Sequence, residues 1–207
     1  MGKRISPKDR SYKNFCISGS GRCGTRFLAN LMNKSEIWTV HHEPGAVGID
    51  NYTSADSIEM TSLRFGKNHY GEVNSMLRRI FLHINVAKRG VLIRNPYDVY
   101  LSIANRKQNT DSKFLDEFKE SLRIVAHALA DKKVKKIEFE KLVTDIEYTQ
   151  EILEWFGICD IEVTKKDITT KVNFTKKENV KYKTIKDLPP EIRKEVLIAS
   201  ERFLEVI

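Results

Sequence analysis

The sequence predicts an α/β fold in which a central parallel sheet is flanked by helices, giving three layers. Short apolar runs alternate along the chain with segments of helical periodicity, which is typical of a parallel sheet covered on both faces. The first apolar run leads into a glycine-rich turn, and a later one leads into an Asn-Pro helix start. The chain has 207 residues, enough for one such domain with its own core, and we expect residues 1–207 to form it.

The first half of the chain opens with an apolar run at 15–17, which predicts a buried strand entering a turn. A helix is expected from Gly24 onward. A second strand is predicted at 37–40 and a longer helix at 73–88, with a polar loop at 45–70 between them. The apolar residues that give the helical spacing are Phe27, Leu28, Leu31 and Met32 in the first helix and Met76, Leu77, Ile80, Phe81 and Ile84 in the second.

The second half continues the alternation. Residues 91–93 predict a third buried strand, after which Asn95 is a favourable N-cap and Pro96 suits the first helical position. The segment at 159–188 is irregular and basic, and it is more typical of a lid or a wrapping tail than of a second domain. The other elements expected are helices at 112–131 and 149–156, a strand at 134–139 and a C-terminal helix at 189–204.

Composition narrows the functional classes. The chain has 36 Lys and Arg against 28 Asp and Glu, a net charge of +8, which favours an anionic ligand. No apolar run approaches the length of a membrane span, and residues 1–14 lack the apolar stretch of a secretory signal. The three cysteines form no CxxC pair or His/Cys cluster, so no metal site is predicted. We expect a cytoplasmic protein with reduced thiols and no membrane partner.

A glycine-rich loop, GSGRCGTR at 19–26, lies between the first predicted strand and the first predicted helix. Glycines let backbone N–H groups converge on an anion, and the helix N-terminus adds partial positive charge. Cys23 stands at this helix start beside two arginines, so its thiol is expected to be accessible and to ionise readily. The sequence therefore predicts a phosphate site formed by Gly21, Arg22, Cys23, Gly24, Thr25 and Arg26.

Several kinds of nucleotide site fit this loop. It satisfies G-x-G-x-x-G, and Glu43 lies about twenty residues further on, where a ribose-binding acid stands in dinucleotide-binding folds. A Rossmann-type NAD(P)-dependent oxidoreductase is therefore one alternative. The loop lacks the Lys-Ser/Thr pair of the Walker motif, which argues against ATP or GTP hydrolysis. A non-catalytic nucleotide- or RNA-binding protein is another alternative, although the basic segment lacks the interleaved aromatic residues typical of nucleic-acid binding.

A second anion site is predicted at the third strand. Arg94 ends this strand beside the capped helix start at Asn95, and Ser102 lies about two turns along that helix. A guanidinium next to exposed N–H groups suits a phosphate. The simpler interpretation of Arg94 is an ion pair with Asp98.

The two motifs together resemble those of the PAPS-dependent sulfotransferases, which use 3'-phosphoadenosine 5'-phosphosulfate and release PAP. In the first loop Cys23 replaces the family's usual Ser, and Arg26 replaces its second hydroxyl residue. The segment at 136–143 resembles a third family motif, with Phe139 in place of Tyr. The matching residues are Arg22, Gly24, Thr25, Phe27 and Leu28 in the 5'-phosphosulfate loop, and Arg94 and Ser102 in the 3'-phosphate motif.

The resemblance implies a P-loop NTPase-like fold, PAPS as donor and sulfuryl transfer to a hydroxyl or amine of a small molecule, glycan or peptide. Arg22 is expected to stabilise charge on the leaving phosphate, without a metal ion. Glu43 is expected to take the proton from the acceptor, because family members commonly use a Glu or His in this region. His42, His41 and Glu72 are alternatives for this base.

Overall fold

The computed structural model describes residues 13–43, 65–170 and 180–207 of the chain. Most of the polar loop predicted at 45–70 lies outside these residues, and so does the centre of the basic segment, including Lys176 and Lys177.

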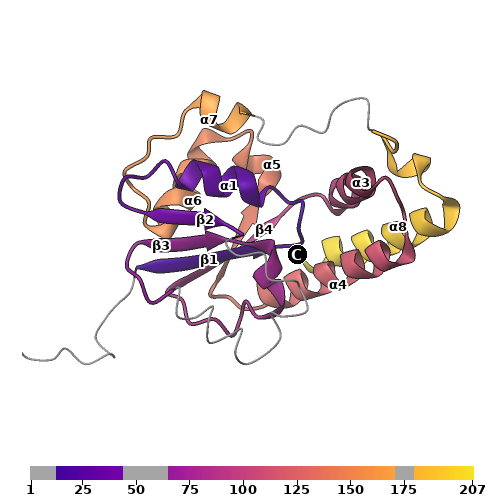
Figure 1. Cartoon of the computed structure of the whole chain (residues 1–207), viewed down its shortest axis with the longest axis horizontal. Coiled ribbons are helices and arrows are strands. Elements are labelled where there is room, and N and C mark those ends of the chain that lie inside the picture. The colour runs from indigo at the N-terminus through magenta and orange to yellow at the C-terminus, as the bar shows by residue number, and fades with distance from the viewer. Residues whose placement is uncertain (1–12, 44–64, 171–179) are drawn as a thin grey trace, which may run out of the picture.

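The sheet has five parallel strands in the order β2-β3-β1-β4-β5 (Figure 1). A parallel sheet is what the sequence predicted. β1 at the centre is buried along its whole length, and it pairs with β3 on one side and β4 on the other. The bounds of the strands are β1 Asn14–Gly19, β2 Thr39–His42, β3 Tyr70–Val73, β4 Lys88–Ile93 and β5 Val134–Glu138.

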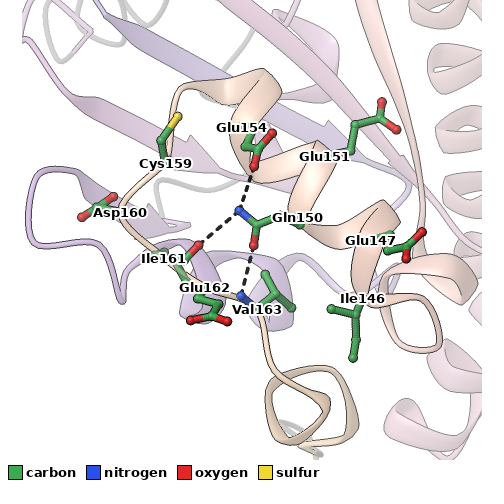
Figure 2. A pocket seen from close by; sticks show the side chains of 10 residues that line it. All are labelled: Ile146, Glu147, Gln150, Glu151, Glu154, Cys159, Asp160, Ile161, Glu162 and Val163. Carbon is green, nitrogen blue, oxygen red and sulfur yellow. Dashed lines mark hydrogen bonds between the residues drawn. The ribbon is translucent and has the colours of Figure 1, made fainter.

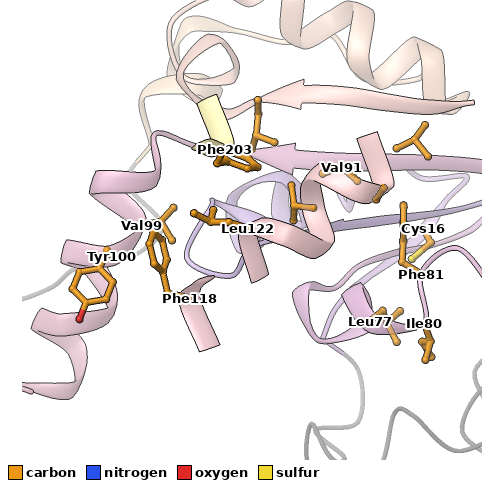
Figure 3. Packing of buried hydrophobic residues seen from close by; sticks show 14 of the residues in the cluster. Cys16, Leu77, Ile80, Phe81, Val91, Val99, Tyr100, Phe118, Leu122 and Phe203 are labelled. Atoms are coloured by element: carbon orange, nitrogen blue, oxygen red, sulfur yellow. The ribbon is translucent and has the colours of Figure 1, made fainter. Parts of the chain in front are cut away.

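Helices cover both faces of the sheet, because successive strand residues point to opposite sides. Phe15 and Ile17 of β1 pack under α1 and α6, whereas Cys16 between them belongs to the cluster under α4 and α8 (Figure 3). The helices are α1 Thr25–Met32, α3 Pro96–Lys107, α4 Ser112–Leu129, α5 Phe139–Leu142, α6 Ile146–Phe156, α7 Lys165–Thr169 and α8 Pro190–Val206, with short 3₁₀ helices η3 Ser75–Arg79 and η5 Ile185–Asp187.

The helix predicted at 73–88 is wrong. Residues 70–73 form strand β3, the short η3 follows, and turns lead to β4 at Lys88. The apolar periodicity reflects burial, since Leu77 and Ile84 are both buried. Two carbonyl groups in this stretch, those of Phe81 and Ile84, accept hydrogen bonds from the Arg89 side chain at 3.4 and 2.5 Å. A side chain from β4 therefore holds this segment as a turn.

The strand predicted at 37–40 is displaced by two residues. β2 begins at Thr39, and Ile37 is 57% exposed. The turn before β2 is held from a distant part of the chain, because the Asp160 carboxylate accepts hydrogen bonds from Ser35 Oγ and from the Glu36 amide. This tertiary contact overrides the local β-propensity of the apolar residues.

We expect Gly71→Ala to destabilise the fold. A Cβ at Gly71 would lie 2.1 Å from the Phe15 ring, and that ring is wedged between Trp38 and Phe156 with centroid separations of 5.2 and 4.9 Å. Overpacking of this kind costs ~1–3 kcal/mol, measurable as a lower free energy of unfolding in urea. The double variant with Phe15→Leu should lose less than the sum of the two single changes, and strict additivity would contradict the clash.

Candidate functional site

The glycine-rich loop connects the carboxyl end of the central strand β1 to α1. β1 is flanked by β3 and β4, and a crevice at such a point is where open α/β sheets bind ligands. Gly21 and Gly24 have φ values of +80° and +100°, which favour glycine. A Cβ at Gly24 would also lie 2.2 Å from the Phe139 ring. Glycine therefore permits the backbone conformation of the loop, and contact with the segment after β5 helps to hold it.

The two predicted phosphate motifs meet at this loop. The Arg22 Nε donates a hydrogen bond to Ser102 Oγ at 3.1 Å, and Arg94 Nη1 donates to the Arg22 carbonyl at 3.3 Å. These two hydrogen bonds join residues that are 80 and 72 positions apart in the sequence. Asn95 accepts from the Tyr97 amide as the N-cap of α3, as predicted, so the exposed amides of this helix start lie next to Arg94.

Arg94 makes the contact with Asp98 that was the simpler of the two interpretations, and it also contacts an aromatic ring. It forms an ion pair with Asp98 at 3.8 Å, and its guanidinium lies 5.1 Å from the centroid of the Phe139 ring. Its Nε is buried and has no hydrogen-bond partner within the described part of the chain. A buried donor in a positively charged site is well suited to an anionic ligand.

Four arginines set the electrostatics of the site. Burial lowers the pKa of Arg22, and the positive charges of Arg106, Arg94 and Arg26 lower it further, while Glu43 acts in the opposite direction. The sequence reasoning missed Arg106. It lies four residues after Ser102 on α3, so the i, i+4 spacing was the signal that places both side chains on one helix face. The excess of positive charge favours an anion with several negative charges.

The end of β2 brings His42 and Glu43 to the same edge of the sheet. Thr25 Oγ1 lies 3.1 Å from His42 Nε2, which in turn lies 3.9 Å from Glu43 Oε1. Burial lowers the pKa of His42, the Glu43 carboxylate raises it and Arg26 lowers it. Burial therefore favours the neutral form of His42, and its ring lies within hydrogen-bond distance of the Thr25 hydroxyl in the loop.

Ser75 is a further residue at this edge that sequence reasoning did not single out. Its Oγ donates to Glu43 Oε1 at 2.6 Å, and it is itself buried. The preceding residue, Asn74, caps η3 with its side chain, and its backbone N–H donates to the Ile17 carbonyl of β1 at 2.8 Å. The hydroxyl that orients Glu43 therefore belongs to a residue whose neighbour is hydrogen-bonded to the central strand.

The other two candidate bases lie differently. His41 points to the opposite side of β2 from His42, and its ring centroid lies 5.6 Å from that of Tyr70. Glu72 was expected near the start of a helix, but it lies in β3 and is 0% exposed. Its carboxylate accepts from Tyr70 Oη at 2.7 Å and from Asn74 Nδ2 at 3.3 Å. Glu72 is therefore part of a buried hydrogen-bond network with Tyr70 and Asn74.

The prediction that Cys23 is an accessible, readily ionised thiol is wrong. The side chain is 0% exposed, and burial raises its pKa to about 11. Its sulfur lies in the hollow of the loop, only 2.6 Å from where a Cβ of Gly19 would be. Position at a helix N-terminus lowers a thiol pKa only if the sulfur remains solvated, and here desolvation dominates.

The topology also contradicts the dinucleotide-binding alternative. In the Rossmann order 3-2-1-4-5, the second strand lies directly beside the first and places its terminal acid near the loop. Here β3 lies between β1 and β2. Glu43 therefore ends a strand that is one position further out than a ribose-binding acid requires.

A surface pocket of about 690 Å³ lies away from the loop, along α6 and the segment that follows it (Figure 2). Gln150 spans it, donating to Glu154 at 3.1 Å and to the Ile161 carbonyl at 3.2 Å, and accepting from the Val163 amide at 3.1 Å. None of the predicted site residues lines this pocket.

Comparison with known proteins identifies the fold. No protein-family profile matches the sequence, and no curated protein matches it. Among solved structures, the sulfotransferase domain of the Synechococcus PCC 7002 olefin synthase matches with a TM-score of 0.57 and 16% identity over 98% of both chains. Mouse sulfotransferase SULT7A1 complexed with PAP matches with a TM-score of 0.57 and 13% identity, over 95% of this chain and 89% of that one. A sulfotransferase from Alicyclobacillus acidocaldarius gives 0.54 and 15%, over 93% and 92%.

This chain has the sulfotransferase fold. The fold class predicted from the two motifs, a P-loop-like α/β fold with a central parallel sheet, is confirmed. Among the described residues, no helix is long and apolar enough to cross a membrane. The same residues contain no group of three His, Cys, Asp or Glu side chains placed to hold a metal ion.

We expect Cys159, the exposed cysteine, to react with iodoacetamide in the native protein at pH 8, and Cys23 to react only after unfolding. Because the pKa of Cys23 is raised to about 11, its thiolate fraction stays small until the pH approaches that value. Peptide mass spectrometry after timed alkylation measures both rates. Equal rates at the two cysteines in native protein would contradict the burial of Cys23.

Proposed function

We propose that this protein is a PAPS-dependent sulfotransferase, which moves a sulfuryl group in line from PAPS to a hydroxyl or amine acceptor. The observation that carries the proposal is the hydrogen bond from Arg22 to Ser102, because it joins a loop suited to a 5'-phosphosulfate to a helix suited to a 3'-phosphate. PAPS carries phosphates at both positions, whereas ATP and NAD do not. The fold shared with three sulfotransferases, one of them complexed with PAP, supports the same conclusion.

In this proposal the loop amides and Thr25 bind the 5'-phosphate, while Arg94, Ser102 and Arg106 bind the 3'-phosphate. Arg22 lies between the two groups and stabilises the charge that develops on the leaving phosphate. Arg26, which is exposed on α1, contributes long-range positive charge. These cations supply the neutralisation that a divalent metal supplies to phosphoryl transfer, so we propose that the reaction uses no metal.

Glu43 is the proposed general base, and His42 is its alternative. The hydrogen bond from Ser75 orients the Glu43 carboxylate, and within the described residues the other carboxylate oxygen accepts no hydrogen bond, so we propose that it faces the acceptor. His42 contacts Thr25 in the loop, which supports a role in holding the donor side instead. The acceptor belongs to the class of small molecules, glycans or peptides. The three free cysteines fit a reducing compartment, and we propose the cytoplasm.

We expect Arg94→Ala to weaken PAP binding by about ten- to a hundred-fold, since a charge-assisted hydrogen bond contributes roughly 1.5–3 kcal/mol. AMP, which lacks the 3'-phosphate, should lose clearly less affinity than PAP, because it loses only the support that Arg94 gives to the Arg22 carbonyl of the loop. Calorimetric titration of both nucleotides against both proteins measures the difference. Equal losses for PAP and AMP would remove the 3'-phosphate assignment, and tighter binding of NAD than of PAP by the wild type would reject the proposed donor.

Glu43→Gln is expected to lower the rate of sulfuryl transfer by roughly 10²–10⁴ while leaving PAP affinity almost unchanged, because the carboxylate faces the acceptor. Arg22→Ala should also lower the rate, by on the order of 10²–10³, because it acts more strongly on the transition state than on bound PAP. Transfer from labelled PAPS to acceptors found by screening with the wild type measures these rates.

His42→Gln is the matched control, because it removes the neighbouring titratable group and keeps a polar side chain. If His42→Gln abolishes turnover while Glu43→Gln retains it, the base is His42. If Glu43→Gln loses PAP affinity in step with its rate, Glu43 is not on the acceptor side.

A further inference from the structure

A groove between α4 and α8 lies on the face of the sheet opposite α1 and shares no residue with the proposed sulfotransferase site. The two helices run side by side in Figure 1, with α8 in yellow. The groove has a volume of about 380 Å³. Its lining residues are Lys119, Leu122, Arg123 and Ala126 from α4 and Glu195, Ile198, Ala199, Arg202, Phe203 and Val206 from α8.

The hollow follows from the sequence of the two helices. The lining residues recur at spacings of three and four, so each helix presents one stripe to the groove. Ala126 and Ala199 are too small to fill the space between the helices. The buried side chains of Leu122 and Phe203, labelled in Figure 3, line the groove beneath them. At the end of α8, Val206 is 69% exposed, so one wall presents apolar surface to water.

The charges around the groove are predominantly positive. Lys119 and Glu195 form an ion pair that bridges the helices, and this contact lowers the pKa of Glu195. The single carboxylate of the lining is therefore already neutralised. Arg123 and Arg202 are exposed, one on each helix, and neither has an ion pair within the described part of the chain. The apolar hollow is thus bordered by two guanidinium groups with free donors.

We propose that this groove binds a small anionic amphiphile, whose apolar body lies over Leu122 and Phe203 and whose head group lies between Arg123 and Arg202. The volume falls within the ~300–1,000 Å³ typical of small-molecule sites, which are mostly apolar with a few polar groups at the edge. Guanidinium groups recognise carboxylates and sulfate esters by the same paired hydrogen bonds. Charge complementarity therefore selects an anionic head over a cationic or neutral one.

The test uses the full chain and three probes with one tail, each below its critical micelle concentration. Decanoate and decyl sulfate represent the two kinds of anionic head, and decyltrimethylammonium is the cationic control. Calorimetry should give one saturable site for an anionic probe, at least about tenfold tighter than for the cation. The tighter of decanoate and decyl sulfate identifies the head group.

Two variants locate that site. Ala199→Trp fills the hollow and should weaken the anionic probe by about tenfold or more, and Arg123→Gln with Arg202→Gln should reduce the preference for an anionic head to about twofold or less. Lys194→Gln, an exposed cation on α8 outside the groove, is the matched control and should change nothing. PAP affinity should be the same in all variants, which separates this proposal from the proposed function and reports that the fold is intact.

Equal binding of the anionic and cationic probes would overturn the proposal. So would retention of anion binding in Ala199→Trp, which would place the probe elsewhere, or the absence of a saturable site in the wild type.

Discussion

The contacts of Arg22 with Ser102 and of Arg94 with the Arg22 carbonyl are the interactions on which the rest of the candidate site depends. They connect the loop after β1 to the start and the second turn of α3, which follows the adjacent strand β4. The loop has few internal restraints, since its glycines permit several backbone conformations. Its shape is set by what packs against it, namely Arg94 on one side and the Phe139 ring beneath Gly24. The residues that we propose to bind phosphate therefore also support the shape of the loop.

The arrangement stores electrostatic repulsion that a ligand relieves. Burial lowers the pKa of Arg22 most, and the positive charges of Arg106, Arg94 and Arg26 lower it further, so each disfavours the charge on Arg22. Arginine side chains carry a positive charge in proteins, so positive charge is concentrated at this site. An anion bound among these arginines would replace repulsion with attraction, so its binding free energy would be more favourable than at a single cation. The same density of charge would favour the proposed polyanionic donor over a nucleotide with one phosphate.

The sequence alone predicted the loop, the Asn95 cap and the parallel sheet, because each depends on local residue types that have few alternative uses. It failed where distant residues decide the outcome. Residues 73–88 have helical periodicity, yet the Arg89 side chain of the next strand donates hydrogen bonds to the carbonyls of Phe81 and Ile84. A strand, a short 3₁₀ helix and turns form here instead. The Cys23 prediction failed for the same reason, since a helix start indicates an ionised thiol only when the loop leaves the sulfur solvated. Ser75 was not found because its importance lies entirely in its contact with Glu43, 32 positions away.

Two residues of the candidate site have an unusual backbone conformation. Among the described residues, four non-glycine residues have a positive φ, and two of them are Arg22 at 52° and Glu43 at 47°. Such conformations cost on the order of 1–3 kcal/mol each and persist only where surrounding contacts hold them. Arg22 is held by Ser102 and by Arg94, and Glu43 is held by Ser75. Both residues follow the carboxyl ends of their strands, and they are the ones proposed to act on the donor and on the acceptor. Strained backbone at these two positions is explained if each side chain must hold a fixed direction before substrate arrives, which is what preorganised charge stabilisation and proton transfer require.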